Sequence, residues 1–315
     1  MKCVVLGGGG FIGSAIADRL LLDGHHVRIF ERAGAQPFRS FSDREAVEWM
    51  TGDLFDHQNV NGAIAGCDTV VHLVSSTLPK SSNDDPVFDV QSNVVGTLHL
   101  LNAMVAQNIR KIIFISSGGT VYGKPAYLPV DEDHPTNPIV SYGVTKLAIE
   151  KYLTIYEARY GINAITLRVT NPFGERQRIG TGQGAVGVFL HRALTGQPIE
   201  IWGDGNVVRD FIHVSDVADA FARCIDYDGP HRLFNISSGE GTSLNELVGI
   251  IRQTLGAAVK CNYQDARSFD TPVSILSNAL AMQELGWAPR VSLQAGIART
   301  AAWMRESISA APQKD

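Results

Sequence analysis

Short apolar runs rich in β-branched residues alternate with longer stretches of helical spacing along the first half of the chain. The runs that predict strands are residues 2–6, 26–31, 49–53, 69–74, 111–117 and 163–169. The stretches that predict helices are residues 12–22, 90–107 and 139–160. Because apolar strands separated by helices are typical of a parallel sheet covered on both faces, the pattern predicts a doubly wound α/β fold.

The regular alternation of predicted strands and helices ends after residue 169. Residues 171–183 are rich in glycine, and a helix is expected at 186–194. Loops of this length usually carry function, so we expect a smaller second lobe to begin here. We expect a first domain of residues 1–171 with a returning segment of about 205–237, and a second lobe of residues 172–204 and 238–315.

Two later segments carry the signals of a helix start. Residues 215–225 predict a helix opened by Ser215. Residues 243–255 predict another, opened by Ser243 with Glu246 three residues later, which is the spacing of a capping box.

The composition is that of an ordinary globular protein, with 44% hydrophobic and 19% charged residues among 315. The net charge of -5, without a dense run of Lys and Arg, argues against nucleic acid as the main partner. The chain turns to glycines directly after residues 2–6, which argues against a signal peptide, and no stretch is apolar for long enough to span a bilayer. We therefore expect a cytoplasmic protein.

The four cysteines are far apart, without a CxxC pair or a histidine spaced to complete a zinc site. They are Cys3, Cys67, Cys224 and Cys261. We expect buried free thiols and no metal site. His72 and His213 lie within apolar runs, where we expect core histidines with satisfied hydrogen bonds.

A glycine-rich segment, residues 7–13, follows the first predicted strand and opens the first predicted helix. Gly7, Gly10 and Gly13 have the spacing GxxGxxG. In this setting the first glycine permits a tight turn, the second lets backbone N–H groups approach a pyrophosphate, and the third allows close packing of helix and strand. The segment predicts a dinucleotide-binding loop.

Acidic residues follow the second and third predicted strands. Glu31 lies about twenty residues beyond the glycines, where a carboxylate accepts hydrogen bonds from both hydroxyls of an adenosine ribose. A 2′-phosphate would meet like charge there, although Arg32 directly follows and is able to pair with it. The balance favours NAD over NADP. Asp53 is expected either over the adenine edge or in a turn after the strand.

Tyr142 and Lys146 are four residues apart and so share one face of a predicted helix that ends at Gly161. A lysine ammonium beside a phenol favours the phenolate and lowers the pKa of the phenol from about 10 toward neutrality. The tyrosine is then able to take a proton from a substrate hydroxyl. Together with the glycine-rich loop, the pair predicts an acid–base site next to a dinucleotide.

Motifs that resemble those of one family are spread over nearly the whole chain. They are residues 7–13, 70–73 (VVHL), 93–97 (NVVGT), 116–123 (SSGGTVYG), 142–146 (YGVTK), 168–172 (RVTNP), 208–214 (VRDFIHV) and 285–287 (LGW). The chain resembles the extended short-chain dehydrogenase/reductase family, in its nucleotide-sugar epimerase/dehydratase branch. The resemblance implies a Rossmann-type fold, NAD as cofactor, a nucleotide sugar, preferably UDP-linked, as substrate, and a homodimer formed through helices 90–107 and 139–160.

The resemblance also implies a reaction. NAD takes the hydride from sugar C4 while a tyrosine takes the hydroxyl proton, the keto sugar rotates, and the hydride returns to the other face. Tyr142 matches that base, and Lys146 matches the lysine that tunes it and holds the nicotinamide ribose. The residues that match further cofactor contacts are Gly7, Gly10, Phe11, Ile12, Gly13, Glu31, Arg32, Asp53, Leu54, Leu73, Asn93 and Ser116.

Five residues match the family's substrate contacts. Asn171 matches the residue that holds the sugar nucleotide near its phosphates. Arg209 and Arg267 match two arginines that clamp the diphosphate, a task that suits guanidinium groups. Asp270 matches an acid near the uridine ribose. Ser274 matches a position that walls the sugar pocket near C2.

The residue at position 274 bears on the size of the sugar. By resemblance, a tyrosine there restricts the enzyme to unsubstituted hexoses, so Ser274 implies that an N-acetyl group fits. The alternative is that another side chain, such as Phe189 or Trp202, closes the pocket.

Gly118 departs from the family pattern. The family usually carries Ser or Thr at this position, four residues before the tyrosine of the VYG motif, where the hydroxyl contacts the substrate O4. Thr120 or Ser117 is able to supply the hydroxyl instead, with Thr120 preferred, although both hydroxyls also suit a structural role at the strand end.

Other activities of the branch remain as alternatives. Dehydratases carry an Asp-Glu pair just before the VYG tyrosine, and decarboxylases tend to hold a glutamate there, whereas this chain has Gly119 and Thr120. The sequence therefore favours a 4-epimerase over a dehydratase or decarboxylase. A reductase of the same family and a catalytically impaired NAD-binding protein are the remaining alternatives, the second being supported by Gly118 alone.

Overall fold

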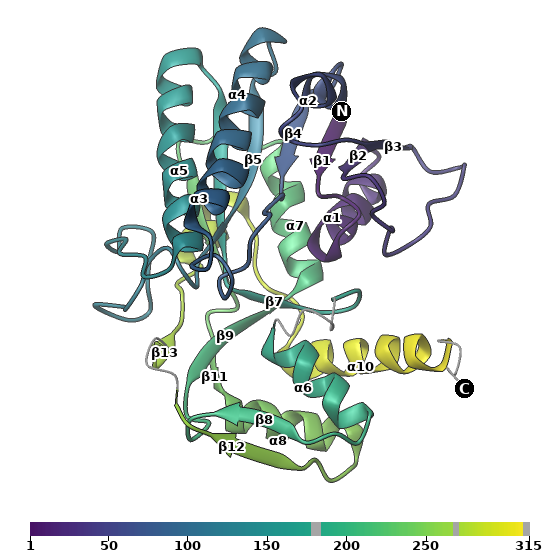
Figure 1. The fold of residues 1–315 in the computed structure, drawn as a ribbon, viewed down its shortest axis with the longest axis vertical. Coiled ribbons are helices and arrows are strands. Elements are labelled where there is room, and N and C mark those ends of the chain that lie inside the picture. The colour runs from purple at the N-terminus through teal and green to yellow at the C-terminus, as the bar shows by residue number, and fades with distance from the viewer. Residues whose placement is uncertain (178–183, 267–270, 311–315) are drawn as a thin grey trace.

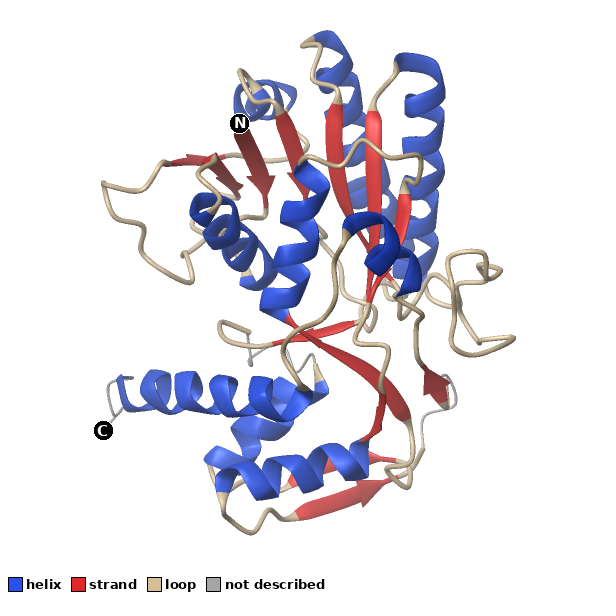
Figure 2. Ribbon diagram, turned by 180° about the vertical axis from the view of Figure 1, so that it is seen from behind, coloured by secondary structure: helices blue, strands red, loops and turns tan. Residues whose placement is uncertain are grey.

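The computed structural model describes residues 1–177, 184–266 and 271–310. Figure 1 shows a large lobe, built on a sheet with helices on both sides, above a smaller lobe that holds the C-terminal helix. Figure 2 shows the same two lobes from behind, where the long strand β9 (Val208–His213) runs between them.

A seven-stranded sheet forms the centre of the large lobe. Its order is β10-β6-β5-β4-β1-β2-β3, and all neighbouring strands are parallel. The strands are β1 (Lys2–Leu6), β2 (His26–Glu31), β3 (Val47–Thr51), β4 (Thr69–His72), β5 (Lys111–Ser117), β6 (Asn163–Val169) and β10 (Leu233–Ile236). The predicted doubly wound fold is confirmed. Chain order reverses between β1 and β4, and ligands bind at the carboxyl ends of strands beside such a switch point.

The two faces of the sheet bury alternate residues of the same strands. Val5 of β1 belongs to a core shared with α1 and α7, and Val4 belongs to the core on the other face, shared with α2, α4 and α5. The helices are α1 (Phe11–Leu22), α7 (Val214–Ile225), α2 (His57–Ile64), α4 (Gly96–Ala106) and α5 (Ser141–Tyr160). Burial on both faces explains why the strands are apolar at consecutive positions.

Most of the predicted elements are present, with shifted ends at some of them. The strand expected at 49–53 is β3, which begins and ends two residues earlier. The helix expected at 90–107 is divided into a π-helix, η1 (Val90–Val95), and α4, and a short helix, α3 (Pro86–Asp89), precedes it. Helix α2 was not predicted from the sequence, because only a few of its residues are apolar.

The small lobe packs three helices beside a pair of parallel strands. The helices are α6 (Ala185–Leu194), α8 (Leu244–Leu255) and α10 (Leu293–Ala310), and the strands are β8 (Ile199–Trp202) and β12 (Cys261–Gln264). Their buried residues form a third apolar core.

A small sheet lies between the two lobes. Strand β9 pairs with β7 (Asn171–Phe173), β11 (Gly241–Ser243) and β13 (Val273–Ser274). Strand β9 then leads directly into α7, while α9 (Ala279–Leu285) follows β13. The segments that pass between the lobes therefore meet at one place, below the carboxyl ends of the large sheet (Figure 1).

The two predicted helix starts have different outcomes. At α8 the capping box of Ser243 and Glu246 is confirmed. At α7 the prediction that Ser215 opens the helix is wrong, since His213 is the N-cap and its Nδ1 accepts a hydrogen bond from the Ser215 N–H at 3.2 Å. The side chain of a buried histidine thus performs the capping that was expected of a serine.

Candidate active site

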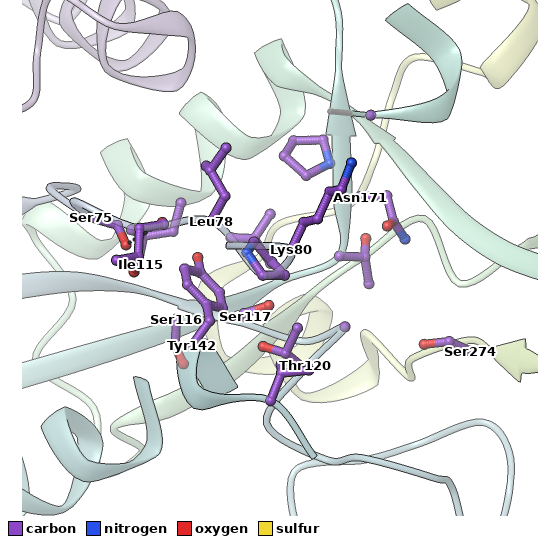
Figure 3. Close-up of a pocket in the computed structure, with 18 of the residues that line it drawn as sticks. Ser75, Leu78, Lys80, Ile115, Ser116, Ser117, Thr120, Tyr142, Asn171 and Ser274 are labelled. Carbon is purple, nitrogen blue, oxygen red and sulfur yellow. Dashed lines mark hydrogen bonds between the residues drawn. The ribbon is translucent and has the colours of Figure 1, made fainter. Parts of the chain in front are cut away.

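A cavity of about 840 Å³ lies where the large sheet meets the small one. Its walls come from the start of α1, the ends of β4, β5 and β6, the loop after β4, the start of α5, and the strands β7, β9 and β13. Figure 3 shows Tyr142, Ser117 and Thr120 around one part of this cavity, with Asn171 and Ser274 on the side of the small sheet.

The glycine-rich loop has the geometry that its spacing predicts. Gly7 has a φ of +86°, a conformation that favours glycine. A Cβ on Gly13 would lie 2.1 Å from the carbonyl oxygen of Gly7, so α1 packs directly on the loop. Gly10 is the N-cap of α1 and gives it no side-chain cap, so the first N–H groups of the helix are directed toward the loop. Phe11 and Ile12 follow and line the cavity.

Glu31 lies beside this loop at the end of β2. Its Oε1 accepts a hydrogen bond from the Gly9 N–H at 2.9 Å. Arg32, the next residue, is exposed. Asp53 is exposed after β3. Its Oδ1 accepts a hydrogen bond from the Phe55 N–H at 2.9 Å, which is the turn contact expected from the sequence as the alternative to an adenine contact.

The other expected cofactor residues lie on both sides of the switch point. Leu73 lines the cavity after β4, and Leu54 is buried beneath the loop after β3. Ser116 lines the cavity and its hydroxyl donates to Glu150. Asn93 is buried, and its Oδ1 accepts from the Ser76 N–H at 3.0 Å, which ties η1 to the loop after β4.

Tyr142 and Lys146 lie one turn apart on α5, where Tyr142 is partly buried and Lys146 is buried. The Lys146 ammonium donates to the Ile115 carbonyl at 3.0 Å and lies 5.5 Å from the centre of the Tyr142 ring. Burial, together with the charge of Asp89, raises the pKa of Tyr142 to about 12, and burial lowers the pKa of Lys146 to about 8. The expectation that Lys146 lowers the pKa of Tyr142 is wrong in this structure, because burial favours the neutral phenol.

The hydroxyls that were expected to replace the one missing at Gly118 both line the cavity. These are Ser117 and Thr120. The Oγ1 atom of Thr120 is buried and has no hydrogen-bond partner within the described part of the chain. A buried hydroxyl without a partner is costly, and this one belongs to a residue that lines the cavity.

The expected substrate residues that the structure describes gather on the opposite wall. Asn171, Arg209 and Ser274 line the cavity, and Ser274 is paired in register with Arg209 across β13 and β9. The Asn171 amide donates to the Asp210 carbonyl at 2.8 Å, and the Arg209 guanidinium donates to the Thr271 carbonyl at 2.6 Å. Arg267 and Asp270, expected here as well, lie outside the described residues.

Trp202 is a residue whose place at the site the sequence did not settle. It lines the cavity at the end of β8 and is 44% exposed. A half-exposed tryptophan at the wall of a cavity is able to contact a ligand. Its position at a strand end, directly before a Gly-Asp-Gly turn, is the sequence signal that distinguishes it from a core aromatic. Phe189, by contrast, is buried in the core of the small lobe.

The expectation that the two core histidines have satisfied hydrogen bonds is confirmed only in part, because the buried Nδ1 atom of His72 has no hydrogen-bond partner in the described part of the chain. The Nε2 atom of His72 lies 2.9 Å from Thr97 Oγ1, and burial lowers the pKa of His72 to about 3. His213 is fully buried, with Nε2 3.1 Å from a carboxylate oxygen of Glu175.

The cysteines are free thiols, of which Cys261 alone is partly exposed rather than buried. Across residues 1–177, 184–266 and 271–310 no three His, Cys, Asp or Glu side chains are grouped so that they could hold a metal ion. In the same ranges no helix has the length and apolar character needed to cross a membrane.

Comparison with known proteins agrees with the geometry of the cavity. Residues 3–237 match the model of the NAD dependent epimerase/dehydratase family. The chain belongs to this family. UDP-glucose 4-epimerase of Mycolicibacterium smegmatis, a relative from the family, is 36% identical over 310 residues, which cover 97% of this chain and 99% of the relative. The family expected from the motifs is therefore confirmed.

Solved structures of the family superpose on almost the whole chain. UDP-glucose 4-epimerase of Thermotoga maritima, solved with UDP-glucose, has a TM-score of 0.92 at 31% identity and covers 98% of this chain and 100% of its own. UDP-glucose 4-epimerase of Thermus thermophilus, solved with NAD, has a TM-score of 0.88 at 32% identity and covers 97% of this chain and 99% of its own.

Proposed function

We propose that this protein is an NAD-dependent 4-epimerase of a UDP-linked sugar. The observation that carries the proposal is the cavity, which Tyr142 lines together with Phe11 and Ile12 next to the glycine-rich loop and with Arg209 of the small sheet. The same cavity thus joins a proton-transferring phenol, the start of a dinucleotide-binding helix and a cation able to bind a second diphosphate. Relatives of this family have been solved with NAD and with UDP-glucose.

The residues present fit the cofactor. A side chain at Gly13 would fill the space of the loop backbone, and the uncapped start of α1 offers N–H groups to a pyrophosphate. Glu31 would hold the adenosine ribose, and Lys146 the nicotinamide ribose. When bound, NAD would supply the hydride acceptor, and then the hydride donor, for sugar C4.

Side chains of the protein carry out the proton transfer and bind the sugar oxygen. Tyr142 takes the proton of the C4 hydroxyl and returns it to the keto sugar. Thr120 hydrogen-bonds the same oxygen with its buried, unpaired hydroxyl. Ser117 is the alternative donor.

The nucleotide end of the substrate lies against the small sheet. Arg209 and Asn171 bind the diphosphate, and Trp202 stacks on the base with its exposed face. Arg267 and Asp270 complete this end by resemblance to the family.

A reductase of the same family is the second candidate, because dTDP-4-dehydro-6-deoxyglucose reductase of Escherichia coli is 37% identical over 229 residues, which cover 73% of this chain. Reduction of a keto sugar needs one hydride transfer, so the site does not have to act on the sugar from both faces. A dehydratase or decarboxylase is less well supported, because Gly119 and Thr120 offer no carboxylate to the cavity.

A homodimer is part of the proposal. Helix α5 carries apolar side chains that are exposed along one face, namely Val144, Tyr152 and Ile155. It runs beside α4 along one side of the large lobe (Figure 1). A pair of helices with such a face buries it against a second copy in a two-fold dimer. A cytoplasmic location also remains part of the proposal.

The test is to incubate the purified protein with a panel of UDP-sugars, without added cofactor, and to separate the products. Epimerisation without added cofactor is expected, because the cofactor is regenerated in each cycle. Turnover that occurs only with added reduced cofactor, and that consumes it in proportion to product, would favour the reductase. Light scattering at micromolar concentration tests the dimer, and a monomer mass would exclude it.

A further inference from the structure

The first turn of α5, which carries Tyr142, is held by a loop that is distant in sequence. The N-cap residue, Val140, makes no side-chain cap. Instead, Asn83 Oδ1 accepts from the Ser141 N–H at 2.8 Å, and Ser82 Oγ accepts from the Tyr142 N–H at 3.0 Å. Helices leave their first N–H groups without internal partners, and here residues 76–85 supply those partners.

Asp89, the last residue of α3, completes this connection and is fully buried. Its Oδ2 accepts from Ser141 Oγ at 2.6 Å and from Thr145 Oγ1 at 3.3 Å. Its Oδ1 accepts from Asn93 Nδ2 at 2.8 Å and from the Thr77 hydroxyl. Both oxygens of the Asp89 carboxylate therefore accept hydrogen bonds from hydroxyls and an amide. These donors are uncharged, and the negative charge of Asp89 lies beside the start of α5.

This charge acts on Tyr142 and on Lys146 in the same sense. It adds to the effect of burial in raising the pKa of Tyr142 to about 12. It also acts, with Glu150, against the burial that lowers the pKa of Lys146 to about 8. Asp89 thus favours the protonated form of both groups. Lys80 of the loop and Arg209 of β9 also line the cavity, and the neutral His72 of β4 lies within electrostatic reach of Lys146.

We propose that Asp89 is a positioning residue for Tyr142: its buried carboxylate fixes the first turn of α5 against residues 76–85 and places a negative charge near the phenol. The inference rests on the proposed function, in which one phenol accepts a proton and later returns it. When the pKa of the phenol is higher, its phenolate is a stronger base and takes the proton faster, but a smaller fraction of the phenol is ionised at neutral pH. Removing the charge should therefore change the pH dependence of turnover as well as its rate.

The test compares Asp89→Asn, which keeps the shape and removes the charge, with the wild-type holoenzyme. The acidic limb of the pH profile of kcat should move to lower pH by about one unit, the scale of a nearby charge. Asp84→Asn, in the same loop but exposed, is the matched control and should leave the limb in place. A limb that stays at the wild-type pH in Asp89→Asn, or that moves to higher pH, overturns the proposal.

The hydrogen bonds are tested separately from the charge. Ser141→Ala keeps the carboxylate and removes one of its donors, so kcat should fall about 3- to 10-fold with KM and the pH limb unchanged. Ser141→Thr keeps the hydroxyl and should restore kcat. If Asp89→Asn does not fold, this pair still decides the positioning role, because wild-type kcat in Ser141→Ala contradicts it.

The role of Asp89 is also testable without the proposed activity. If the wild-type protein epimerises no UDP-sugar, the phenolate absorbance of the holoenzyme is titrated instead, as the difference between each protein and its Tyr142→Phe counterpart. A midpoint at lower pH in Asp89→Asn supports the role of Asp89 whatever the substrate. An unchanged midpoint overturns it.

Discussion

The side chain of Leu276 fills the space toward which a side chain at Gly118 would point. A Cβ on Gly118 would lie 2.4 Å from Leu276 Cδ1 and 3.2 Å from the Arg168 carbonyl oxygen. Leu276 is buried in a small core with Val121, Tyr122 and Val130. Position 118 thus faces this core, while residues 117, 119 and 120 line the cavity.

Restoring the family's usual serine at this position should therefore not improve the enzyme. Gly118→Ser should lower the free energy of unfolding by about 1–3 kcal/mol, the usual cost of overpacking, without raising kcat. Gly119→Ser is the matched control, because its Cβ would meet nothing within 4 Å, and it should leave stability nearly unchanged. Thermal unfolding and initial rates measure both effects. A gain in kcat at wild-type stability would show that the position does reach the substrate.

The hydroxyl that acts in place of the missing one should be that of Thr120. Thr120→Val keeps the shape and removes a buried oxygen that has no partner in the described structure, so stability should hold or rise slightly. Turnover should fall by about 10²-fold, within the range of lost proton-transfer contacts. Tyr142→Phe sets the lower limit of activity in the same assay.

Ser117→Ala is the comparison for Thr120→Val. It should lower kcat much less if Thr120 is the acting hydroxyl. A larger loss of kcat in Ser117→Ala than in Thr120→Val would assign the role to Ser117. Wild-type kcat in both variants would mean that neither hydroxyl takes part.

The parts of this site that were predicted from the sequence depend on local patterns. The glycine spacing and the pair Tyr142 and Lys146 each lie within one short segment, and their geometry follows from the adjoining strand and helix. The strands β1, β2, β5 and β6 have the predicted bounds because each is a short run rich in β-branched or aromatic residues between turn residues.

The parts that were missed depend on contacts between distant segments. Asp89 meets Ser141 across 52 positions of the chain, and the space beside Gly118 is filled by Leu276 from beyond β13. The pKa of Tyr142 was misjudged for the same reason, since its burial and the charge of Asp89 are properties of the assembled fold. Sequence spacing alone carries no information about such contacts.

The cofactor should be NAD, and its selection should depend on Glu31. The protein should release NAD(H) when it is denatured, because a 4-epimerase keeps the cofactor through both hydride transfers. Glu31→Gln keeps an acceptor for the Gly9 N–H and removes the charge that repels a 2′-phosphate, so the preference for NAD should fall about tenfold. Asp53→Asn, on an exposed turn, is the control. Recovery of NADP(H) from the wild-type protein would contradict the role of Glu31.

Glu175 should make the protein more stable at neutral than at low pH. Burial alone would raise the pKa of this carboxylate, but the hydrogen bond with His213 and the charges of His213 and Arg299 lower it to about 2. The unfolded value is about 4.3. Since the folded pKa is the lower one, the stabilisation is complete above about pH 4.3 and is lost as the pH falls through about 2.

Glu175→Gln should therefore lower the free energy of unfolding by about 2 kcal/mol at neutral pH, and the difference from wild type should disappear near pH 2. Glu157→Gln, which removes a more exposed pair with Arg232, should cost less than about 1 kcal/mol. Denaturant unfolding at several pH values measures both. A deficit in Glu175→Gln that does not change with pH would contradict the ionic origin of the stabilisation.

The size of the sugar should be set at Ser274. This residue lines the cavity in β13 and is paired in register with Arg209, which the proposed function places at the diphosphate. The proposed function therefore places the side chain at 274 next to the sugar end of the nucleotide. Of the alternative walls considered from the sequence, Phe189 is buried in the core of the small lobe, so it does not close the cavity, and Trp202 faces it from the end of β8.

The wild-type protein should consequently accept UDP-N-acetylglucosamine or its galacto epimer as well as UDP-glucose. Ser274→Tyr adds an aromatic ring to a wall of the cavity, and a steric wall discriminates by exclusion, so turnover of the N-acetylated sugar should fall by at least about 10²-fold while UDP-glucose turnover changes little. Ser274→Ala leaves the space open and should keep both activities. The assignment fails if the wild-type protein acts only on the sugars without an acetyl group, or if the tyrosine variant loses both activities equally, because exclusion at one position requires that the smaller substrate still fit.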